Sequence, residues 1–169
     1  RALETLDRFK RTRIQTTHTP DSNTPLQAVY VDGRLAGTTS KTGITRRYGY
    51  DALGRRIAVE DPRKGISTIT YDQSGRLEAV QDPAGNRARF EYDPESGRKI
   101  GEINALNKAT RYQYNQRGQL IRSWGDVPYP VEYAYDAFGQ MMVMRTFRSG
   151  HGWKGYTWPA DTRPGDQTI

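Results

Sequence analysis

Residues 50–55 read Tyr50-Asp51-Ala52-Leu53-Gly54-Arg55, and this pattern of tyrosine, aspartate and glycine returns along the chain at a nearly constant spacing. The tyrosines of five copies stand at positions 50, 71, 92, 114 and 135. The motif residues are Tyr50, Asp51 and Gly54; Tyr71, Asp72 and Gly75; Tyr92, Asp93 and Gly97; Tyr114, Asn115 and Gly118; and Tyr135, Asp136 and Gly139. A fixed period of about 21 residues is typical of stacked supersecondary units, so the sequence predicts a repeat architecture.

The period continues more weakly towards the start of the chain. Gly33-Arg34-Leu35 lies one period before Gly54-Arg55-Arg56, and residues 4–8 parallel residues 51–55, which makes about seven units. We expect one repeat array with a degenerate repeat and a polar insert over 1–29 and regular repeats over 30–147. An extended Trp-containing inter-repeat segment is expected over 148–169. Both ends are expected to lie inside a longer array.

Each unit is predicted to be a β-hairpin. A bulky residue stands two positions before each motif tyrosine, which is the period of one strand face. These residues are Tyr48, Ile69, Phe90, Tyr112 and Tyr133. Asp-x-x-Gly supplies the reversal, because Asp accepts hydrogen bonds from nearby amides and Gly adopts the positive φ of a short hairpin loop. The predicted fold class is all-β, a repetitive antiparallel hairpin meander with the Tyr-Asp turns along one rim.

The composition favours a thin, extended sheet. Only 34% of the residues are hydrophobic, while 11 tyrosines, 4 phenylalanines and 3 tryptophans are available for aromatic contacts between strands. The chain contains no cysteine, which excludes disulfides and thiolate metal sites. It also has no apolar run of the length, about 18 residues, that could span a membrane. Cut sheet edges would allow self-association of the chain.

No enzyme is predicted. The two histidines, His18 and His151, have no neighbouring nucleophile at a recognisable spacing. The aspartates of the motif recur because a turn recurs, whereas a catalytic site needs unlike groups that converge. We therefore expect no catalytic residue, no metal and no cofactor.

Two binding functions remain as alternatives. Arg34, Arg55, Arg76 and Arg98 would form a ladder along the rim, either solvated or paired with acids of adjacent hairpins. The ladder lapses at Gln119 and Gln140, so a nucleic-acid groove is not favoured. Trp124, Trp153 and Trp158 lie outside the regular tyrosine positions and are candidates for exposed platforms that bind carbohydrate.

The motifs at 50–56, 71–77 and 92–98 closely resemble the YD repeats of the RHS family. That family includes bacterial Rhs proteins, the cocoon-forming subunits of insecticidal Tc toxins, and teneurins. The resemblance implies a long β-sheet that spirals into a hollow shell. Such a shell commonly encloses a toxic C-terminal domain or acts as an extracellular adhesion scaffold.

The leading hypothesis is therefore a non-enzymatic structural segment of a YD-repeat shell, secreted or at the cell surface. Its expected partners are adjacent YD repeats and an encapsulated C-terminal toxin domain. A carbohydrate-binding surface, with cell-surface glycans as partners, is the alternative. The family's self-cleaving core motif is not found here, since Asp82-Pro83-Ala84-Gly85 reads as a turn inside the repeats.

Overall fold

The computed structural model describes residues 2–7, 11–18, 20, 26–147, 153–159 and 166–168, of which 2–7 and 166–168 are described as backbone only. Within these ranges the chain forms fifteen β-strands and no helix. They fall into two compact units, residues 1–86 and residues 87–169. Each unit is described by itself; the predicted boundaries near residues 30 and 148 stay predictions.

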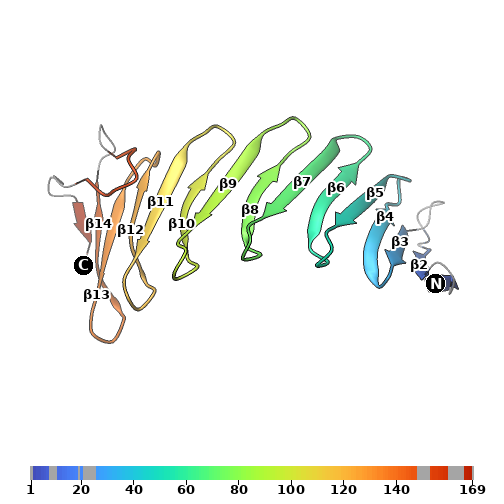
Figure 1. Ribbon diagram of the computed structural model, residues 1–169, viewed down its shortest axis with the longest axis horizontal. Coiled ribbons are helices and arrows are strands. Elements are labelled where there is room, and N and C mark those ends of the chain that lie inside the picture. The colour runs from blue at the N-terminus through green and yellow to red at the C-terminus, as the bar shows by residue number, and fades with distance from the viewer. Residues whose placement is uncertain are drawn as a thin grey trace. The chain divides into compact units, whose positions relative to one another are not determined.

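Unit 1 (residues 1–86) is an antiparallel sheet whose strands lie in the order of the sequence. It contains β1 (Ala2–Asp7), β2 (Thr12–Thr17), β3 (Leu26–Val31), β4 (Arg34–Thr39), β5 (Thr45–Tyr50), β6 (Arg56–Asp61), β7 (Gly65–Tyr71) and β8 (Leu77–Gln81). Figure 1 shows its Tyr-Asp turns on the lower edge of the sheet and the connecting turns on the upper edge.

Unit 2 (residues 87–169) has the same topology. It contains β9 (Arg87–Tyr92), β10 (Lys99–Ile103), β11 (Ala109–Tyr114), β12 (Leu120–Gly125), β13 (Val131–Tyr135), β14 (Met141–Thr146) and β15 (Asp166–Thr168). The described strand pairs of the two units give seven hairpins, and β15 follows them as a single strand paired with β14. The predicted all-β hairpin meander is confirmed.

The turns form because Asp and Gly fulfil two local requirements. In the repeat that contains Tyr50, the Gly54 N–H donates to the Asp51 carbonyl at 2.9 Å, and Gly54 has a φ of +82°. The register shifts between Gly49 and Tyr50, which is the bulge that such a turn produces. The connecting turns use the same chemistry, for example the Gly85 N–H to Asp82 carbonyl bond at 3.0 Å.

The bulky residues two positions before the motif tyrosines share one sheet face within each unit. In unit 1, Tyr48 pairs with Val59, which pairs with Ser67, and Ile69 lies two residues further along the same face. The register of unit 2 likewise places Phe90, Tyr112 and Tyr133 on one face. All five are half-buried. The predicted face of bulky residues therefore exists within each unit, while among the described residues the ring-to-ring contacts are those of the tryptophan and phenylalanine cluster of unit 2.

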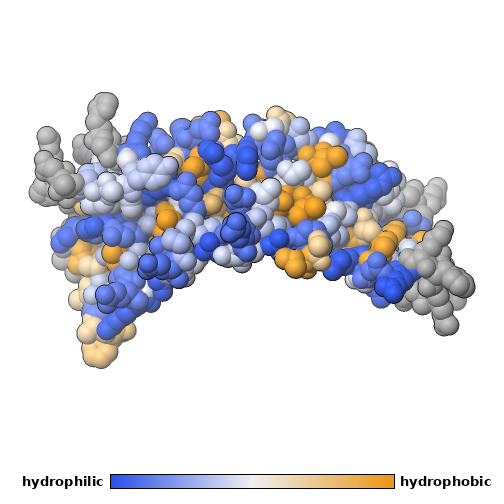
Figure 2. Space-filling view, viewed as in Figure 1, coloured by the Kyte–Doolittle hydropathy of each residue, from blue (hydrophilic) through white to orange (hydrophobic). Residues whose placement is uncertain are grey.

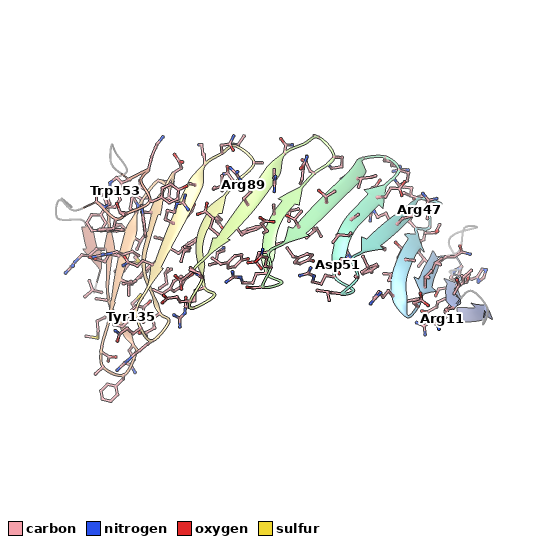
Figure 3. All side chains as sticks on the ribbon, in the orientation of Figure 1. Arg11, Arg47, Asp51, Arg89, Tyr135 and Trp153 are labelled. Carbon is pink, nitrogen blue, oxygen red and sulfur yellow. The ribbon has the colours of Figure 1, made fainter. Side chains whose placement is uncertain are left out.

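The core of unit 2 lies on the opposite sheet face. Trp124, Phe147 and Trp153 are buried there, and Trp158 packs against them. Phe147 follows β14 directly and donates its N–H to the Pro130 carbonyl at 2.8 Å. Figure 3 shows Trp153 at the upper edge of unit 2, away from the Tyr-Asp turns.

Candidate functional site: the row of tyrosine and aspartate turns

Within each unit, motif tyrosines join their hairpin to the one before it. The Tyr50 hydroxyl donates to the Leu35 carbonyl at 2.9 Å, and the Tyr71 hydroxyl donates to the Arg56 carbonyl at 2.9 Å. The same bond, always fifteen positions back in the chain, links Tyr114 to the Lys99 carbonyl and Tyr135 to the Leu120 carbonyl. Sequence reasoning missed this role. The only signal for it was that tyrosine, and not phenylalanine, recurs.

The motif aspartate closes its own turn. Asp72 Oδ1 accepts the Arg76 N–H at 2.8 Å, and Asp72 Oδ2 accepts the Arg76 Nε–H at 2.7 Å. Asp51 and Arg55 repeat this geometry. The arginines of these two turns therefore pair with the aspartate of their own hairpin, so the expectation of pairing with acids of adjacent hairpins is wrong here. The i to i+4 spacing within the turn brings the two side chains together.

The arginine then extends over the next hairpin. The Arg55 guanidinium lies 4.5 Å from the centre of the Tyr71 ring. A Cβ placed on Gly75 would lie 3.2 Å from Arg55 Nη1, and one on Gly54 would lie 2.7 Å from Arg34 Nη2. The motif glycine is thus favoured by its positive φ, and a side chain there would also have to displace the guanidinium of the preceding hairpin's arginine.

The repeat that contains Tyr114 uses neutral amides for the same contacts. Asn115 Oδ1 accepts the Gln119 N–H at 3.0 Å, and Asn115 Nδ2 donates to Gln119 Oε1 at 2.8 Å. Gln119 Nε2 also donates to the Gly139 carbonyl of the next turn at 2.9 Å. At Gln119, where the arginine ladder is interrupted, a neutral side chain therefore makes the junction with the next hairpin.

The two remaining motif copies keep the turn with different partners. Asp93 Oδ1 accepts the Ser96 N–H at 2.7 Å, in the turn that has one extra residue. Asp136 Oδ1 accepts the Phe138 N–H at 2.9 Å and the Gln140 N–H at 2.8 Å. The turn glycines of both copies, Gly97 and Gly139, have a positive φ.

The electrostatics of the row agree with a structural role. Partial desolvation raises the pKa of Asp51, but hydrogen bonds from the Arg55 backbone and guanidinium outweigh it and hold that pKa below its ordinary value. The pKa of Asp72 is lowered in the same way by Arg76. In the connecting turn of unit 1, Arg46 donates to Asp61 at 2.8 Å and lowers the pKa of that carboxyl. Each of these carboxylates is held ionised by a local partner, which suits a fixed turn and not a proton-transfer group.

The expectation of exposed tryptophan platforms is wrong for Trp124 and Trp153. Trp124 and Trp153 are only 5% and 8% exposed, and Trp158 is half-buried with its ring centre 4.8 Å from that of Trp153. Trp124 Nε1 also donates to the Gly155 carbonyl at 3.1 Å. The rings are buried because residues 153–159 fold back onto the sheet and supply the apolar layer that this face otherwise lacks. Two of the three therefore have no open ring face for a sugar.

The folded-back residues are held by charge as well. The Arg122 guanidinium lies 4.9 Å from the Trp158 ring centre, and the Arg111 guanidinium lies 3.9 Å from the Tyr156 ring centre. Arg111 is buried and also pairs with Glu91. The sequence period gives no sign of these contacts, because residues 153–159 do not carry the motif.

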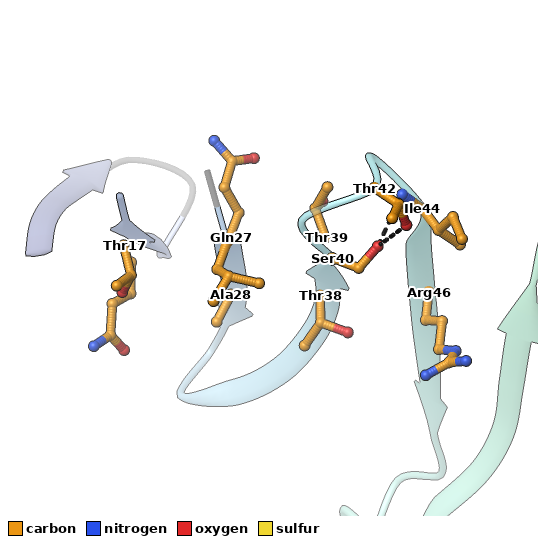
Figure 4. Close-up of a pocket in the computed structure, with 11 residues that line it drawn as sticks. Thr17, Gln27, Ala28, Thr38, Thr39, Ser40, Thr42, Ile44 and Arg46 are labelled. Atoms are coloured by element: carbon orange, nitrogen blue, oxygen red, sulfur yellow. Dashed lines mark hydrogen bonds between the residues drawn. The ribbon is translucent and has the colours of Figure 1, made fainter. Parts of the chain in front are cut away.

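A groove of about 560 Å³ lies on unit 1 (Figure 4). It opens where Ala28 takes the position that Tyr48 and Ile69 hold in the later repeats, two residues before the motif tyrosine. Thr17, Thr38 and Arg46 are among the residues that line it. The lining combines the apolar Leu26, Ala28 and Ile44 with hydroxyls, two glutamine amides and the guanidinium of Arg46, which is already paired with Asp61.

The described residues provide no other chemical centre. His18 is exposed next to the end of β2, while His151 lies outside the described residues. No three acids, histidines or cysteines among the described residues are grouped to hold a metal ion. Over the same residues no helix is long and apolar enough to cross a membrane.

Comparisons with known proteins agree with the geometry. The family model described as "Teneurin YD-shell" matches residues 7–151. No curated protein sequence matches the chain. The chain is similar to crystal structures of TcdB2-TccC3-TEV (TM-score 0.63, 17% identity, covering 84% of this chain and 9% of that one) and TcdB2-TccC3-Cdc42 (TM-score 0.61, 16% identity, 80% and 8%). It is also similar to the Tc holotoxin pore of Photorhabdus luminescens (TM-score 0.59, 17% identity, 80% and 8%). The chain thus spans less than a tenth of those chains.

Proposed function

Because the chain belongs to the teneurin YD-shell family, we propose that its hairpins form a segment of the wall of a hollow β-shell that encloses a polypeptide, in particular a toxin. The match to the teneurin YD-shell model supports the shell role, and the similarity to TcdB2-TccC3 structures supports the same fold. The segment contributes structure and no catalysis, and the protein works outside the cell or at its surface.

The observation that carries this proposal is the double junction between successive hairpins. One junction is the tyrosine hydroxyl bond to the backbone of the preceding hairpin, as in Tyr50 to the Leu35 carbonyl. The other is the side chain after the turn glycine, which reaches the next hairpin, as in Arg55 over the Tyr71 ring. Both act along the rim, and each adds to the strand pairing. A wall needs neighbour contacts of this kind because a thin sheet has little core to hold it together.

The charged side chains of the row are engaged in these junctions. Arg55 and Arg76 are paired within their turns, and Asp51 and Asp72 accept those bonds. A substrate or a metal ion would have to displace them. A structural role therefore keeps these ion pairs, whereas binding a substrate or a metal ion would require them to break.

The test uses the full-length protein that contains this segment. Limited proteolysis should leave an enclosed polypeptide intact for as long as the wall is folded. Gly54→Val and Gly75→Val place branched side chains at φ values of +82° and +80°, and should make the enclosed polypeptide sensitive to protease. Leu53→Ser is the matched control in the same turn, because Leu53 is 76% exposed. A full-length protein in which no polypeptide is protected would contradict enclosure.

A further inference from the structure

The groove on unit 1 crosses neighbouring strands on one face of the sheet. Along its floor runs a row of directly paired residues on β2 to β5, in the order Gln15, Ala28, Thr38 and Arg46. With strands about 4.8 Å apart, this row is roughly 14 Å long, which is the length of about four extended residues. The groove is therefore long enough to hold a short extended peptide across the strands.

The middle of the groove is apolar and its wall is fixed. Leu26, Ala28 and Ile44 all line it. The Ser40 hydroxyl holds the adjoining turn, because it accepts the Ile44 N–H at 3.2 Å and is bonded to the Thr42 hydroxyl at 2.9 Å (Figure 4). An aliphatic side chain can therefore enter a surface that is already formed, which lowers the entropic cost of binding.

Arg46 gives one end of the groove a pair of donors. Its Nε–H donates to Asp61 Oδ2 at 2.8 Å, which holds the guanidinium from the side. The guanidinium forms no other hydrogen bond with the described residues, and the Arg46 side chain is 55% exposed. Its Nη1 and Nη2 groups therefore form an open fork, which matches the two oxygens of a carboxylate. The Thr38 hydroxyl, bonded to the Tyr48 hydroxyl at 3.1 Å, lies on the paired strand beside this fork.

The charge around this fork is positive. Asp61 neutralises Arg46, but the exposed Arg63 and Lys64 follow in the same turn. The pKa of Asp61 is lowered first by the Arg46 hydrogen bond and also by the nearby charge of Lys64. Figure 2 shows a mostly hydrophilic surface at the upper edge of unit 1 beside β5 and β6. Such a surface attracts an acidic partner and disfavours a basic one.

We propose that this groove binds an acidic segment of a polypeptide, with a glutamate carboxylate on the Arg46 fork and an aliphatic side chain over Ala28. The Thr38 hydroxyl donates to the same carboxylate, and the Gln15 amide at the far end bonds to the peptide backbone. A polypeptide fits better than a small acid, because the lining continues over about 14 Å from Arg46 to Gln15. The inference concerns unit 1 alone and does not require that the polypeptide be enclosed.

The experiment titrates the nitrogen-15-labelled 169-residue chain with the peptide acetyl-Gly-Leu-Glu-Ser-Gly-amide, whose glutamate is its only carboxylate. The matched peptide carries glutamine in place of glutamate. The glutamate peptide should shift the amide resonances of Ala28, Thr38 and Arg46. It should also bind about tenfold more tightly than the glutamine peptide, because charge-assisted hydrogen bonds are about twice as strong as neutral ones.

Three variants locate the site. Arg46→Gln should remove the preference for glutamate. Arg47→Gln is the matched control, because it removes the same charge from the opposite face, where Arg47 pairs with Glu60. Ala28→Tyr places in the groove the kind of bulky side chain that Tyr48 provides one repeat later, and should abolish binding. Circular dichroism checks that each variant is folded, and Ala28→Tyr decides the question if Arg46→Gln unfolds.

Equal affinity for the two peptides would overturn the proposal. So would an equal loss in Arg46→Gln and Arg47→Gln, which would indicate general attraction between charges, or undiminished binding to Ala28→Tyr. Binding of N-acetylglutamate amide as tightly as the pentapeptide would also overturn it, because the groove would then be a site for a small acid.

Discussion

The Tyr135 hydroxyl donates a hydrogen bond of 2.8 Å to the backbone carbonyl of Leu120, fifteen positions earlier in the preceding hairpin. Tyr135 also ends its own strand, next to the turn that Asp136 closes. One side chain therefore takes part in the hairpin it belongs to and in the junction with its neighbour. Figure 3 shows Tyr135 near the lower end of the hairpin, where the junction lies.

Tyr135→Phe should lower the free energy of unfolding by about 0.5–1.5 kcal/mol, because the ring stays and only the hydroxyl bond is lost. Urea denaturation followed by tryptophan fluorescence measures this in unit 2, since all three tryptophans lie there. Tyr129→Phe is the control, because the Tyr129 side chain is 63% exposed. Equal midpoints for the two variants would show that the junction contributes nothing.

Gly54→Ala should destabilise the chain more than Gly33→Ala. Both glycines have a similar positive φ, +82° and +77°, so both substitutions incur backbone strain of about 1–2 kcal/mol. Only Gly54 of the two faces a neighbour, since a Cβ there would lie 2.7 Å from Arg34 Nη2, whereas Gly33 has open space. In an Arg34→Ala background the added cost at Gly54 should shrink. Urea midpoints from far-ultraviolet circular dichroism are measured for Gly54→Ala, Gly33→Ala, Arg34→Ala and the double variant Arg34→Ala with Gly54→Ala. If Gly54→Ala lowers the midpoint as much in the Arg34→Ala background as in the natural sequence, the prediction is wrong.

The stability of unit 1 should fall in acid below about pH 4. The pKa values of Asp51 and Asp72 are lower in the folded chain than the ordinary carboxyl value of about 3.9. A lowered folded pKa means that the stabilising contribution is complete above the unfolded pKa and is lost as the pH falls through the folded pKa. Urea midpoints measured from pH 6 down to pH 2 should therefore be flat at first and then decline.

The combined change Asp72→Asn and Arg76→Gln is the control for this acid effect. It copies the neutral Asn115 and Gln119 pair, which keeps the turn bonds without a titrating group. The variant should retain the turn at pH 6 and lose less stability between pH 4 and pH 2 than the natural sequence. An acid slope that is the same in both proteins would show that Asp72 does not contribute to it.

Trp124→Ala should destabilise unit 2 by about 3–5 kcal/mol, because it removes a buried ring from a cluster of four aromatic side chains. Trp124→Phe should cost less, since it keeps a ring and loses chiefly the bond to the Gly155 carbonyl. Differential scanning calorimetry measures both. Lys154→Ala is the control in the folded-back segment, because its side chain is 78% exposed and pairs with Asp126 instead of contacting the aromatic cluster. A small effect of Trp124→Ala would mean that residues 153–159 do not form a core with the sheet.

The hairpins, their number and their order could be predicted from the amino-acid sequence alone. The reason is that a turn makes local demands: positive φ at Gly54 or Gly75 and a nearby acceptor at Asp51 or Asp72 can be recognised within a few positions. The alternation of bulky residues before each turn then sets the strand face, because the strand period is two. The constant spacing of the motif predicted that the hairpins are stacked units, and the resemblance to YD repeats indicated the family.

Which side chains meet across hairpins could be learned only from the three-dimensional arrangement. The bond between Tyr71 and the Arg56 carbonyl, the position of Arg55 over the Tyr71 ring, and the burial of Trp124 under Gly155 all join residues that are far apart in the sequence. Such contacts depend on the strand register and on the bulge beside each turn, and a segment outside the repeat can fold back onto the sheet without any periodic signal. Trp124 and Trp153 were therefore expected to be exposed and instead lie in the core of unit 2, because the burial of a ring depends on which segment packs over its sheet face.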